Sequence, residues 1–283
     1  MESRTTISAT PHLKLNQELQ LKEKVLTLEN KVNDLHDSIR YASVIQQAIL
    51  PNMQLFLDSF TDAFVYYEPK DLISGDFYWH YRHKNTVYFA VGDCTGHGVP
   101  GALVNMAANS FLQQIIKQKG VYNPAKIITL LDKEMSALFN NNRSVGQTND
   151  GIDMGLCQFN LNTKKGHYCG AGRPLYLIRK GELIEFDKGK NAIGYLADTK
   201  KTFTSIYFDL KKNDSFYMFS DGYTDQFGGE NIKKFNRKRF RVLLKSIQDK
   251  TLTQQEDELR LTFENWKGKH EQVDDVCVLG VRI

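Results

Sequence analysis

The segment VYFAVGDCTGHGVPGALVNMAANSFL, from Val87 to Leu112, joins an apolar run to a glycine loop and then to a predicted helix. The apolar run ends on Asp93, and Pro100 opens the helix, since proline suits the first helical turn. A loop with this composition can hold a dinucleotide, a phosphate or a cation. The residues around it argue against the first two.

The letters GHGVPG in this loop match the G-x-G-x-x-G dinucleotide fingerprint, but the surrounding sequence does not. That fingerprint requires an acidic residue about 20 positions later, at the end of a parallel strand. Here the first acid after Gly101 is Asp132, inside a predicted helix. No Gly-Lys-Ser/Thr follows, so a P-loop is excluded, and Asp93 would repel a pyrophosphate. An acid at a strand end beside flexible backbone favours a cation site instead.

Other aspartates occupy comparable places at predicted strand ends. Asp76 lies in SGDFYW, Asp221 follows SFYMFS, and Asp274 and Asp275 precede VCVLGV. Each of them taken alone is typical of a turn. If folding gathers them, two carboxylates about 4 Å apart repel by about 4 kcal/mol at an effective dielectric constant of about 20, so cations are needed to keep the group ionised. Without a neighbouring Cys/His set, oxygen ligation indicates Mg²⁺ or Mn²⁺ rather than zinc.

The composition is that of a soluble globular protein, with 41% hydrophobic and 25% charged residues. A net charge of +4 over 283 residues is too small to indicate nucleic-acid binding. The four cysteines are far apart, and they are expected to be small core residues in a reducing compartment. No apolar run reaches the roughly 18 residues of a membrane span, and no signal peptide is recognisable. We therefore expect a cytoplasmic protein.

The N-terminal part is predicted to be disordered over residues 1–12 and to form a coiled-coil helix over residues 13–50. From Leu21 to Ile49, nine positions follow one another in alternating steps of four and three: Leu21, Val25, Leu28, Val32, Leu35, Ile39, Ala42, Gln46 and Ile49. All of them are apolar except Gln46. β-Branched residues at a and Leu at d favour a parallel homodimer. The alternative is one long amphipathic helix packed on its own domain. Gln46 interrupts the seam, and Pro51 ends the helix.

Residues 55–283 are predicted to form one domain of the α+β class with mainly antiparallel sheets. Three strands near 62–69, 76–82 and 86–93 precede a pair of helices at 100–118 and 124–140. Three successive β-hairpins follow, the last of them in FTSIYFDLKKNDSFYMFSDG. Two further helices, near 231–248 and 253–266, precede a final strand, VCVLGVRI.

The order SGDFYW, VGDCTGHGVPGAL, FSDGYTDQF and DDVCVLGV resembles the metal-dependent protein phosphatase 2C-like superfamily, in particular the branch named for the stage II sporulation protein E phosphatase. The resemblance covers residues 55–283 and implies a β-sandwich flanked by helices, with two Mn²⁺ or Mg²⁺ ions at one end. It implies that Asp93 bridges both metals and that the backbone carbonyl of Cys94 completes one shell. It assigns the other carboxylates to Asp76, Asp221 and Asp274, with Asp275 as the alternative to Asp274.

The implied chemistry is attack on phosphorus by a water that the two dications convert to hydroxide. Cys94 is then not a nucleophile. His97 is a candidate general acid for the leaving serine or threonine oxygen, or a hydrogen-bonded loop residue. Phosphatases of the eukaryotic type use an arginine near the first strand to bind phosphate, and residues 41–81 contain none. Arg173, in GAGRPLY, is the candidate substitute, with a solvated hairpin arginine as the alternative.

Two functions follow from the resemblance. The first is a protein serine/threonine phosphatase of bacterial signalling, dimerised by its N-terminal helix, that acts on a phosphorylated regulatory protein such as an anti-sigma-factor antagonist. The second is a catalytically silent scaffold that binds partners through the coil. The basic run KKFNRKRFRVLLK, Lys233–Lys245, is expected to be a solvated helix face, with docking of an acidic phosphoprotein as its alternative function.

Overall fold

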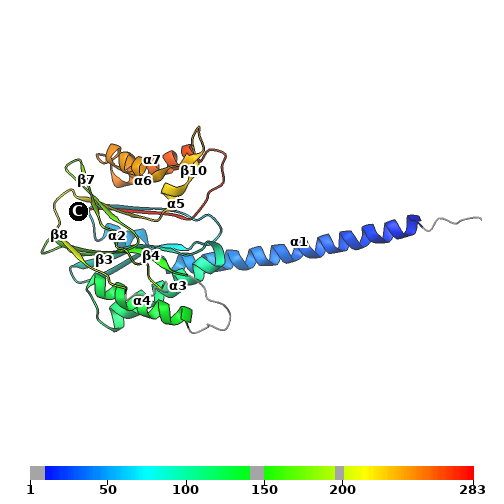
Figure 1. The fold of residues 1–283 in the computed structure, drawn as a ribbon, viewed down its shortest axis with the longest axis horizontal. Helices are drawn as coiled ribbons and strands as arrows, with labels where there is room; N and C mark the ends of the chain where they lie inside the picture. The colour runs from blue at the N-terminus through cyan, green and yellow to red at the C-terminus, as the bar shows by residue number, and fades with distance from the viewer. Residues whose placement is uncertain (1–9, 141–149, 195–200) are drawn as a thin grey trace, which may run out of the picture. The chain divides into compact units, whose positions relative to one another are not determined.

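The computed structural model describes residues 10–140, 150–194 and 201–283, with side chains from residue 18 onward except at residue 140. The chain separates into two compact units, Met1–Val44 and Ile45–Ile283. The larger unit is built around two five-stranded sheets packed face to face, with helices covering the outer face of each sheet (Figure 1). All strand pairings in both sheets are antiparallel, which confirms the predicted α+β sandwich.

The two sheets are interleaved along the chain. The first sheet has the order β1-β12-β9-β6-β7, and its strands are β1 (Asp62–Glu68), β12 (Val276–Arg282), β9 (Ser215–Phe219), β6 (Leu175–Arg179) and β7 (Glu182–Phe186). The second has the order β2-β3-β4-β5-β8, and its strands are β2 (Asp76–His83), β3 (Thr86–Cys94), β4 (Ile152–Asn160), β5 (Lys165–Ala171) and β8 (Ile206–Asp209). Residues far apart in the sequence therefore meet where the two sheets face each other.

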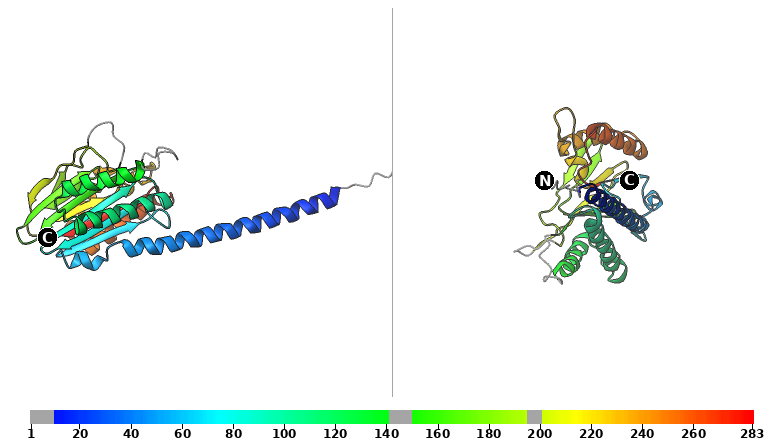
Figure 2. Two further views of the ribbon diagram at one scale, coloured as in Figure 1. Left: turned by 90° about the horizontal axis from the view of Figure 1, so that it is seen from below. Right: turned by 90° about the vertical axis from the view of Figure 1, so that its right-hand side faces the viewer.

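Helices complete the layers on both sides. On the second sheet lie α3 (Gly98–Gln113), its π-helical extension η1 (Gln114–Gln118) and α4 (Pro124–Asn140). On the first sheet lie α6 (Asn236–Ser246) and α7 (Leu252–Lys267), and the short α5 (Gly222–Asp225) follows β9. Figure 2 shows the two helix layers on opposite sides of the sandwich. Short elements complete the unit: α2 (Met53–Leu57), β10 (Phe227–Gly228) and β11 (Lys233–Lys234).

Three apolar cores hold these layers together. One joins α3 and α4 to the second sheet, one lies between the two sheets, and one joins α6 and α7 to the first sheet. Aromatic side chains fill the interior between the sheets; Phe159, for example, contacts the rings of Phe89 and Phe216 at centroid distances of 4.8 and 4.7 Å. All four cysteines lie among the described residues and are buried free thiols, which fits their predicted role as small core residues.

Two local expectations were wrong. The run FTSIYFDLKKNDSFYMFSDG is not a hairpin, because β8 pairs with β5 whereas β9 pairs with β6 and β12. Residues 210–214 carry the chain from one sheet to the other, and nothing in the alternation of apolar residues distinguishes such a crossing from a hairpin turn. The helix expected from residue 231 begins only at Asn236, because Lys233–Lys234 pairs with Phe227–Gly228 as a small ribbon.

The predicted basic helix face is largely engaged with neighbouring groups. Arg241 pairs with Glu185, Lys234 pairs with Asp225, and the guanidinium of Arg239 lies 4.8 Å from the ring centroid of Trp266. Phe240 and Leu244 are buried against the first sheet, as the pattern predicts. These contacts describe an ordinary solvated helix with a structural role.

The smaller unit consists of the helix α1 (Thr10–Ile49) up to Val44. The predicted disordered segment, residues 1–12, lies outside the described residues up to residue 9, and its last three residues belong to α1. The heptad side chains from Leu21 to Leu35 are exposed on this helix: Leu21, Val25, Leu28, Val32 and Leu35. Among the described residues, no helix is both long and apolar enough to span a bilayer.

Candidate metal centre

Three aspartates lie side by side across the second sheet. Asp76 at the start of β2 pairs in register with Asp93 near the end of β3, and Asp93 pairs with Asp153 near the start of β4. Directly opposed residues in antiparallel strands have Cβ atoms about 5 Å apart, and like charges at such positions are destabilising. The strand register therefore concentrates negative charge at this end of the sheet.

The first sheet adds further carboxylates to the same end of the sandwich. Asp221 follows β9 and Asp274 precedes β12, and these two strands are antiparallel neighbours, so the end of one lies beside the start of the other. The backbone N–H of Ser220 donates to the carbonyl of Cys277, which ties the two segments together at 2.9 Å. Asp274 and Asp221 each raise the pKa of Asp93, which means that the carboxylates of the two sheets interact electrostatically.

Asp76 is the most deeply buried acid of the group, with 2% of its surface exposed. Burial raises the pKa of Asp76 well above its ordinary range, Asp93 raises it further, and a hydrogen bond from Ser220 lowers it. One carboxylate oxygen, Oδ2, has no hydrogen-bond partner among the described residues. Because a buried carboxylate oxygen without a partner is costly, this atom is suited to bind a cation.

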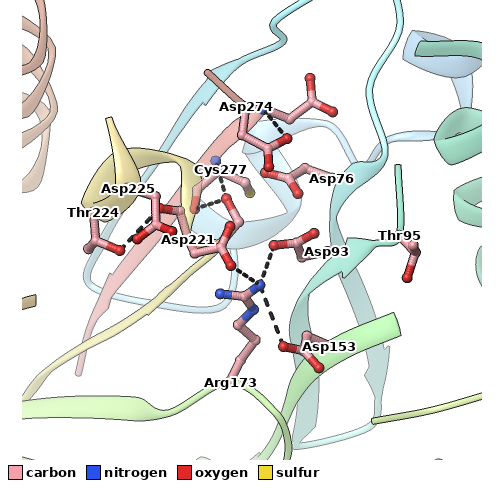
Figure 3. A network of polar contacts seen from close by, with 12 residues as sticks. Asp76, Asp93, Thr95, Asp153, Arg173, Asp221, Thr224, Asp225, Asp274 and Cys277 are labelled. Carbon is pink, nitrogen blue, oxygen red and sulfur yellow. Dashed lines mark hydrogen bonds and ion pairs between the residues drawn. The ribbon is translucent and has the colours of Figure 1, made fainter. Parts of the chain in front are cut away.

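Arg173 occupies the centre of the remaining carboxylates, as Figure 3 shows. Its Nη2 atom forms ion pairs with Asp93, with Asp221 at 2.8 Å and with Asp153 at 3.6 Å. The side chain is 5% exposed, so the interpretation of Arg173 as a solvated hairpin residue is wrong. The chain crosses between the sheets at this point, which places the guanidinium inside the sandwich end rather than on a turn.

The electrostatics of Asp93 reflect these competing neighbours. The pKa of Asp93 is raised to about 7. Burial is the largest cause, Arg173 acts against it by lowering the pKa, and the neighbouring carboxylates raise the pKa further: Asp221, Asp274 and Asp153. Burial also raises the pKa of Asp153, and Arg173 opposes that effect. One arginine therefore does not neutralise the cluster, and the group retains a demand for additional positive charge.

Asp275 differs from Asp274 in the use of its carboxylate. Both of its oxygens accept backbone hydrogen bonds, from Lys70 N and from Gly75 N, each at 2.8 Å. Asp275 is buried, with 3% of its surface exposed, and its two hydrogen bonds anchor the loop that leads into Asp76. Among the described residues, the Asp274 carboxylate accepts one hydrogen bond, from the N–H of Asp275 at 2.9 Å, and its other oxygen has no partner. This geometry separates an anchoring acid from an acid available to a ligand.

The glycine loop after Asp93 packs tightly against the segment before Asp76. A Cβ on Gly101 would lie 2.1 Å from the carbonyl oxygen of Gly96, and one on Gly75 would lie 2.7 Å from the same oxygen. The carbonyl oxygen of Cys94 faces Gly75, since a Cβ there would lie 3.1 Å from it. The Cys94 thiol is buried in the core under α3, and burial raises its pKa well above its ordinary value, so it is not a thiolate nucleophile.

His97 lies at the rim, immediately before α3. Its Nδ1 atom is 2.9 Å from Oδ2 of Asp71, and its Nε2 atom is 3.2 Å from Nζ of Lys70. The side chain is half exposed. The Asp71 carboxylate accepts from the Nδ1 side and orients the imidazole, and Nε2 is the acceptor toward Lys70, because an ammonium can only donate. The sequence analysis did not identify Lys70 and Asp71, because both lie in the loop before β2, which contains no recognisable motif.

The residue types at this end of the sandwich fit a hard dication, although the described side chains are not positioned to coordinate one. Within the described part of the chain, no group of three or more Asp, Glu, His or Cys side chains has the arrangement of a metal site as it stands. Arg173 holds the oxygens of Asp93 and Asp221 that such a site would use. The unpartnered oxygen of Asp76, the raised pKa of Asp93 and the all-oxygen donor set fit Mg²⁺ or Mn²⁺.

Asp153 is a further acidic residue that the sequence analysis missed. The signal was present, since Asp153 follows Gly151 by two residues at a strand start, much as Asp76 follows Gly75. Asp153 packs directly against Gly172, which has a φ of +93°. A Cβ added at position 172 would lie 2.1 Å from Asp153 Oδ1, so a side chain there would clash with this carboxylate. A pocket of about 250 Å³ adjoins these residues and is lined by Asp93, Thr95, Gly151, Ile152, Asp153, Arg173 and Ala192.

Comparisons with known proteins identify the family of this chain. A family model described as Stage II sporulation protein E (SpoIIE) matches residues 83–283. In Bacillus subtilis (strain 168), the phosphoserine phosphatase RsbP is 24% identical over 235 residues, which cover 82% of this chain and 53% of RsbP. The phosphoserine phosphatase RsbU of the same strain is 24% identical over 205 residues, which cover 70% of this chain and 57% of RsbU.

This chain therefore spans little more than half the length of these curated relatives. The solved structure of the SiaA-PP2C domain of Pseudomonas aeruginosa superposes with a TM-score of 0.80 and 32% identity. That match covers 89% of this chain and 98% of the solved domain, so the similarity includes nearly the whole fold.

Proposed function

Because the chain belongs to the stage II sporulation protein E (SpoIIE) family, we propose that it is a metal-dependent protein serine/threonine phosphatase of bacterial signalling. The observation that carries this proposal is the convergence of Asp76, Asp93, Asp153 and Asp221 from both sheets at one end of the sandwich. Such a concentration of partly buried acids is destabilising unless cations bind it.

We assign the metal ligands to Asp76, Asp93, Asp221 and Asp274, together with the backbone carbonyl of Cys94. Two Mn²⁺ or Mg²⁺ ions held there would lower the pKa of a shared water and offset charge on the phosphoryl oxygens. The free oxygens of Asp76 and Asp274 support their assignment. Asp275 keeps the role of an anchor, since both of its oxygens already accept backbone hydrogen bonds.

Side chains of the chain itself would handle the substrate. His97, oriented by Asp71, would hold the proton for the leaving serine or threonine oxygen at the rim of the site. Arg173 lines the pocket beside Asp93 and Asp153, which supports its predicted role in binding phosphoryl oxygens. Glycines at positions 75, 96 and 101 let the two loops approach closely and keep the acids in place.

The substrate in this proposal is a phosphorylated regulatory protein, and the active form is a homodimer. RsbP and RsbU are named phosphoserine phosphatases, which supports a phosphoserine or phosphothreonine substrate for this chain. The exposed heptad residues Leu21, Leu28 and Leu35 support dimerisation through α1, because an unpaired apolar stripe on a long helix favours a coiled-coil partner.

The silent scaffold remains the second candidate, and one observation favours it. Arg173 already supplies a cation to Asp93 and Asp221, as a protein without metals would require.

Hydrolysis of p-nitrophenyl phosphate separates the two functions. We expect turnover that depends on added Mn²⁺ and that Asp93→Asn abolishes, while the matched change Asp225→Asn leaves it near the wild-type rate. Asp225 lies one helical turn from Asp221 but pairs with Lys234 outside the cluster. Hydrolysis absent in wild type would favour the scaffold, whereas hydrolysis insensitive to Asp93→Asn would contradict the role assigned to Asp93.

A further inference from the structure

Arg173 is held rigidly at the meeting point of the two sheets. Gly172, at φ +93°, turns the chain beside Asp153, and the backbone carbonyl of Arg173 accepts a hydrogen bond from the buried hydroxyl of Tyr168. The guanidinium then lies against Asp93 and Asp221, which come from different sheets (Figure 3).

The guanidinium cannot lose its charge in this position. Burial by itself would lower the pKa of Arg173, but Asp93, Asp221 and Asp153 outweigh burial and raise it above its ordinary value. The same Nη2 atom contacts all three carboxylates, so one positive charge is shared among three negative ones. Its Nε atom has no partner among the described residues, which shows that the guanidinium is placed for the acids rather than for its own hydrogen bonding.

Arg173 contacts two of the acids that the proposed metals need. Oδ2 of Asp93 and Oδ2 of Asp221 both accept hydrogen bonds from Nη2. A dication and a guanidinium repel each other and compete for carboxylate lone pairs. A metal at Asp93 and Asp221 therefore either displaces Arg173 from these oxygens or binds through the second oxygen of each acid against the repulsion of the guanidinium, and both lower the metal affinity.

We propose that Arg173 is an internal counter-ion that competes with divalent metal for Asp93 and Asp221. It stabilises the metal-free site and lowers the metal affinity, so that occupancy follows the concentration of free metal instead of being permanent. Released from the acids, the guanidinium stays beside the pocket and Asp153, where it faces a phosphoryl group. This inference rests on the proposed metal-dependent function and adds to it a residue that sets metal affinity.

The experiment measures Mn²⁺ affinity by isothermal titration calorimetry on the full chain, in wild type and in Arg173→Met. Methionine keeps an unbranched side chain and removes the charge. Because a charge-assisted hydrogen bond no longer has to be broken, we expect Arg173→Met to bind Mn²⁺ between about tenfold and about a hundredfold more tightly. Arg173→Lys keeps a charge without the planar fork, and we expect an affinity between those of Arg173→Met and wild type.

Arg179→Met is the matched control. Arg179 is the last residue of β6, the strand that begins two residues after Arg173, and it pairs with the buried Asp214 at 2.6 Å, away from the metal centre. We expect this variant to lose stability without a change in Mn²⁺ affinity. Thermal unfolding supplies the second readout: metal-free Arg173→Met should melt below wild type, and saturating Mn²⁺ should raise its melting temperature by more than it raises that of wild type.

The outcomes separate this inference from the proposed function. If wild type is a Mn²⁺-dependent phosphatase but folded Arg173→Met binds Mn²⁺ no more tightly than wild type, the inference alone is overturned. If wild type takes up no Mn²⁺, both fail. Should Arg173→Met not fold, Arg173→Lys decides, because weaker Mn²⁺ binding in that variant than in wild type would contradict competition.

Discussion

Replacing Asp275 by alanine tests whether the two consecutive acids of DDVCVLGV have different roles. Asp275 is buried, and its carboxylate accepts the N–H groups of Lys70 and Gly75, both at 2.8 Å. A hydrogen bond to a charged group contributes about 1.5–3 kcal/mol, so loss of both would cost about 3–6 kcal/mol. Removal of the repulsion between Asp275 and Asp76 offsets part of this. We expect Asp275→Ala to lower the free energy of unfolding by about 3 kcal/mol.

Asp274→Ala is the matched comparison, because Asp274 accepts only the N–H of its neighbour, at 2.9 Å, and is partly exposed. We expect a loss of stability of about 1 kcal/mol or less and a large loss of Mn²⁺ affinity. Urea unfolding in the presence of a chelator, followed by circular dichroism, measures the first quantity, and calorimetry measures the second. Equal stability losses in the two variants would refute the division into anchor and ligand, as would an Asp275→Ala protein as stable as wild type.

Three further predictions concern other parts of the chain. Gln46→Leu removes the two hydrogen bonds between the buried Gln46 amide and the backbone of Ser74, at 2.6 and 3.0 Å. The free energy of unfolding, measured by urea titration, should fall by about 2 kcal/mol, and no change would show that this contact is dispensable. In metal-free protein the pKa of Asp93 is raised from 3.8 to about 7, so the folded state binds more protons than the unfolded chain between these values. Asp93 alone should therefore lower the stability by on the order of 4 kcal/mol as pH rises from about 4 to about 7. The raised pKa values of Asp76 and Asp153 add to this fall, so Asp93→Asn should reduce the slope without removing it, and an unchanged slope would contradict the assignment. Deletion of residues 1–44, which keeps Gln46, should convert a dimer into a monomer in light scattering, and a full-length chain that is already monomeric would disprove dimerisation through α1.

Gln46 also shows where heptad reasoning stopped being sufficient. The repeat predicts that position 46 belongs to the coiled-coil seam, where a polar residue is an interruption. In the structure its amide is buried and pairs with Ser74, two residues before Asp76. Periodicity describes which face of a helix is apolar, but it carries no information about which tertiary surface meets the last turn.

Short-range chemistry was sufficient to predict most elements. β-Branched and aromatic runs bounded by turn residues predicted β1, β2 and β3, and Pro124 together with Asn123 predicted the start of α4. The strand-end aspartates Asp76, Asp93 and Asp221 were identified because an acid at the edge of an apolar run is conspicuous in the sequence itself. The motif order then led to the correct family and fold.

The partners of those acids depend on strand order, which the chain does not encode locally. The sequence of β8 and β9 predicts a hairpin, yet these strands belong to different sheets, and a separate crossing between β5 and β6 carries Arg173 into the acidic cluster. Asp153 enters the site only because β4 is the neighbour of β3, and Asp275 became an anchor only because the loop at Lys70 lies against it. Residue type and spacing reveal which groups bear charge, whereas long-range pairing determines which charges meet, because the energies that select this pairing act between segments more than 200 residues apart.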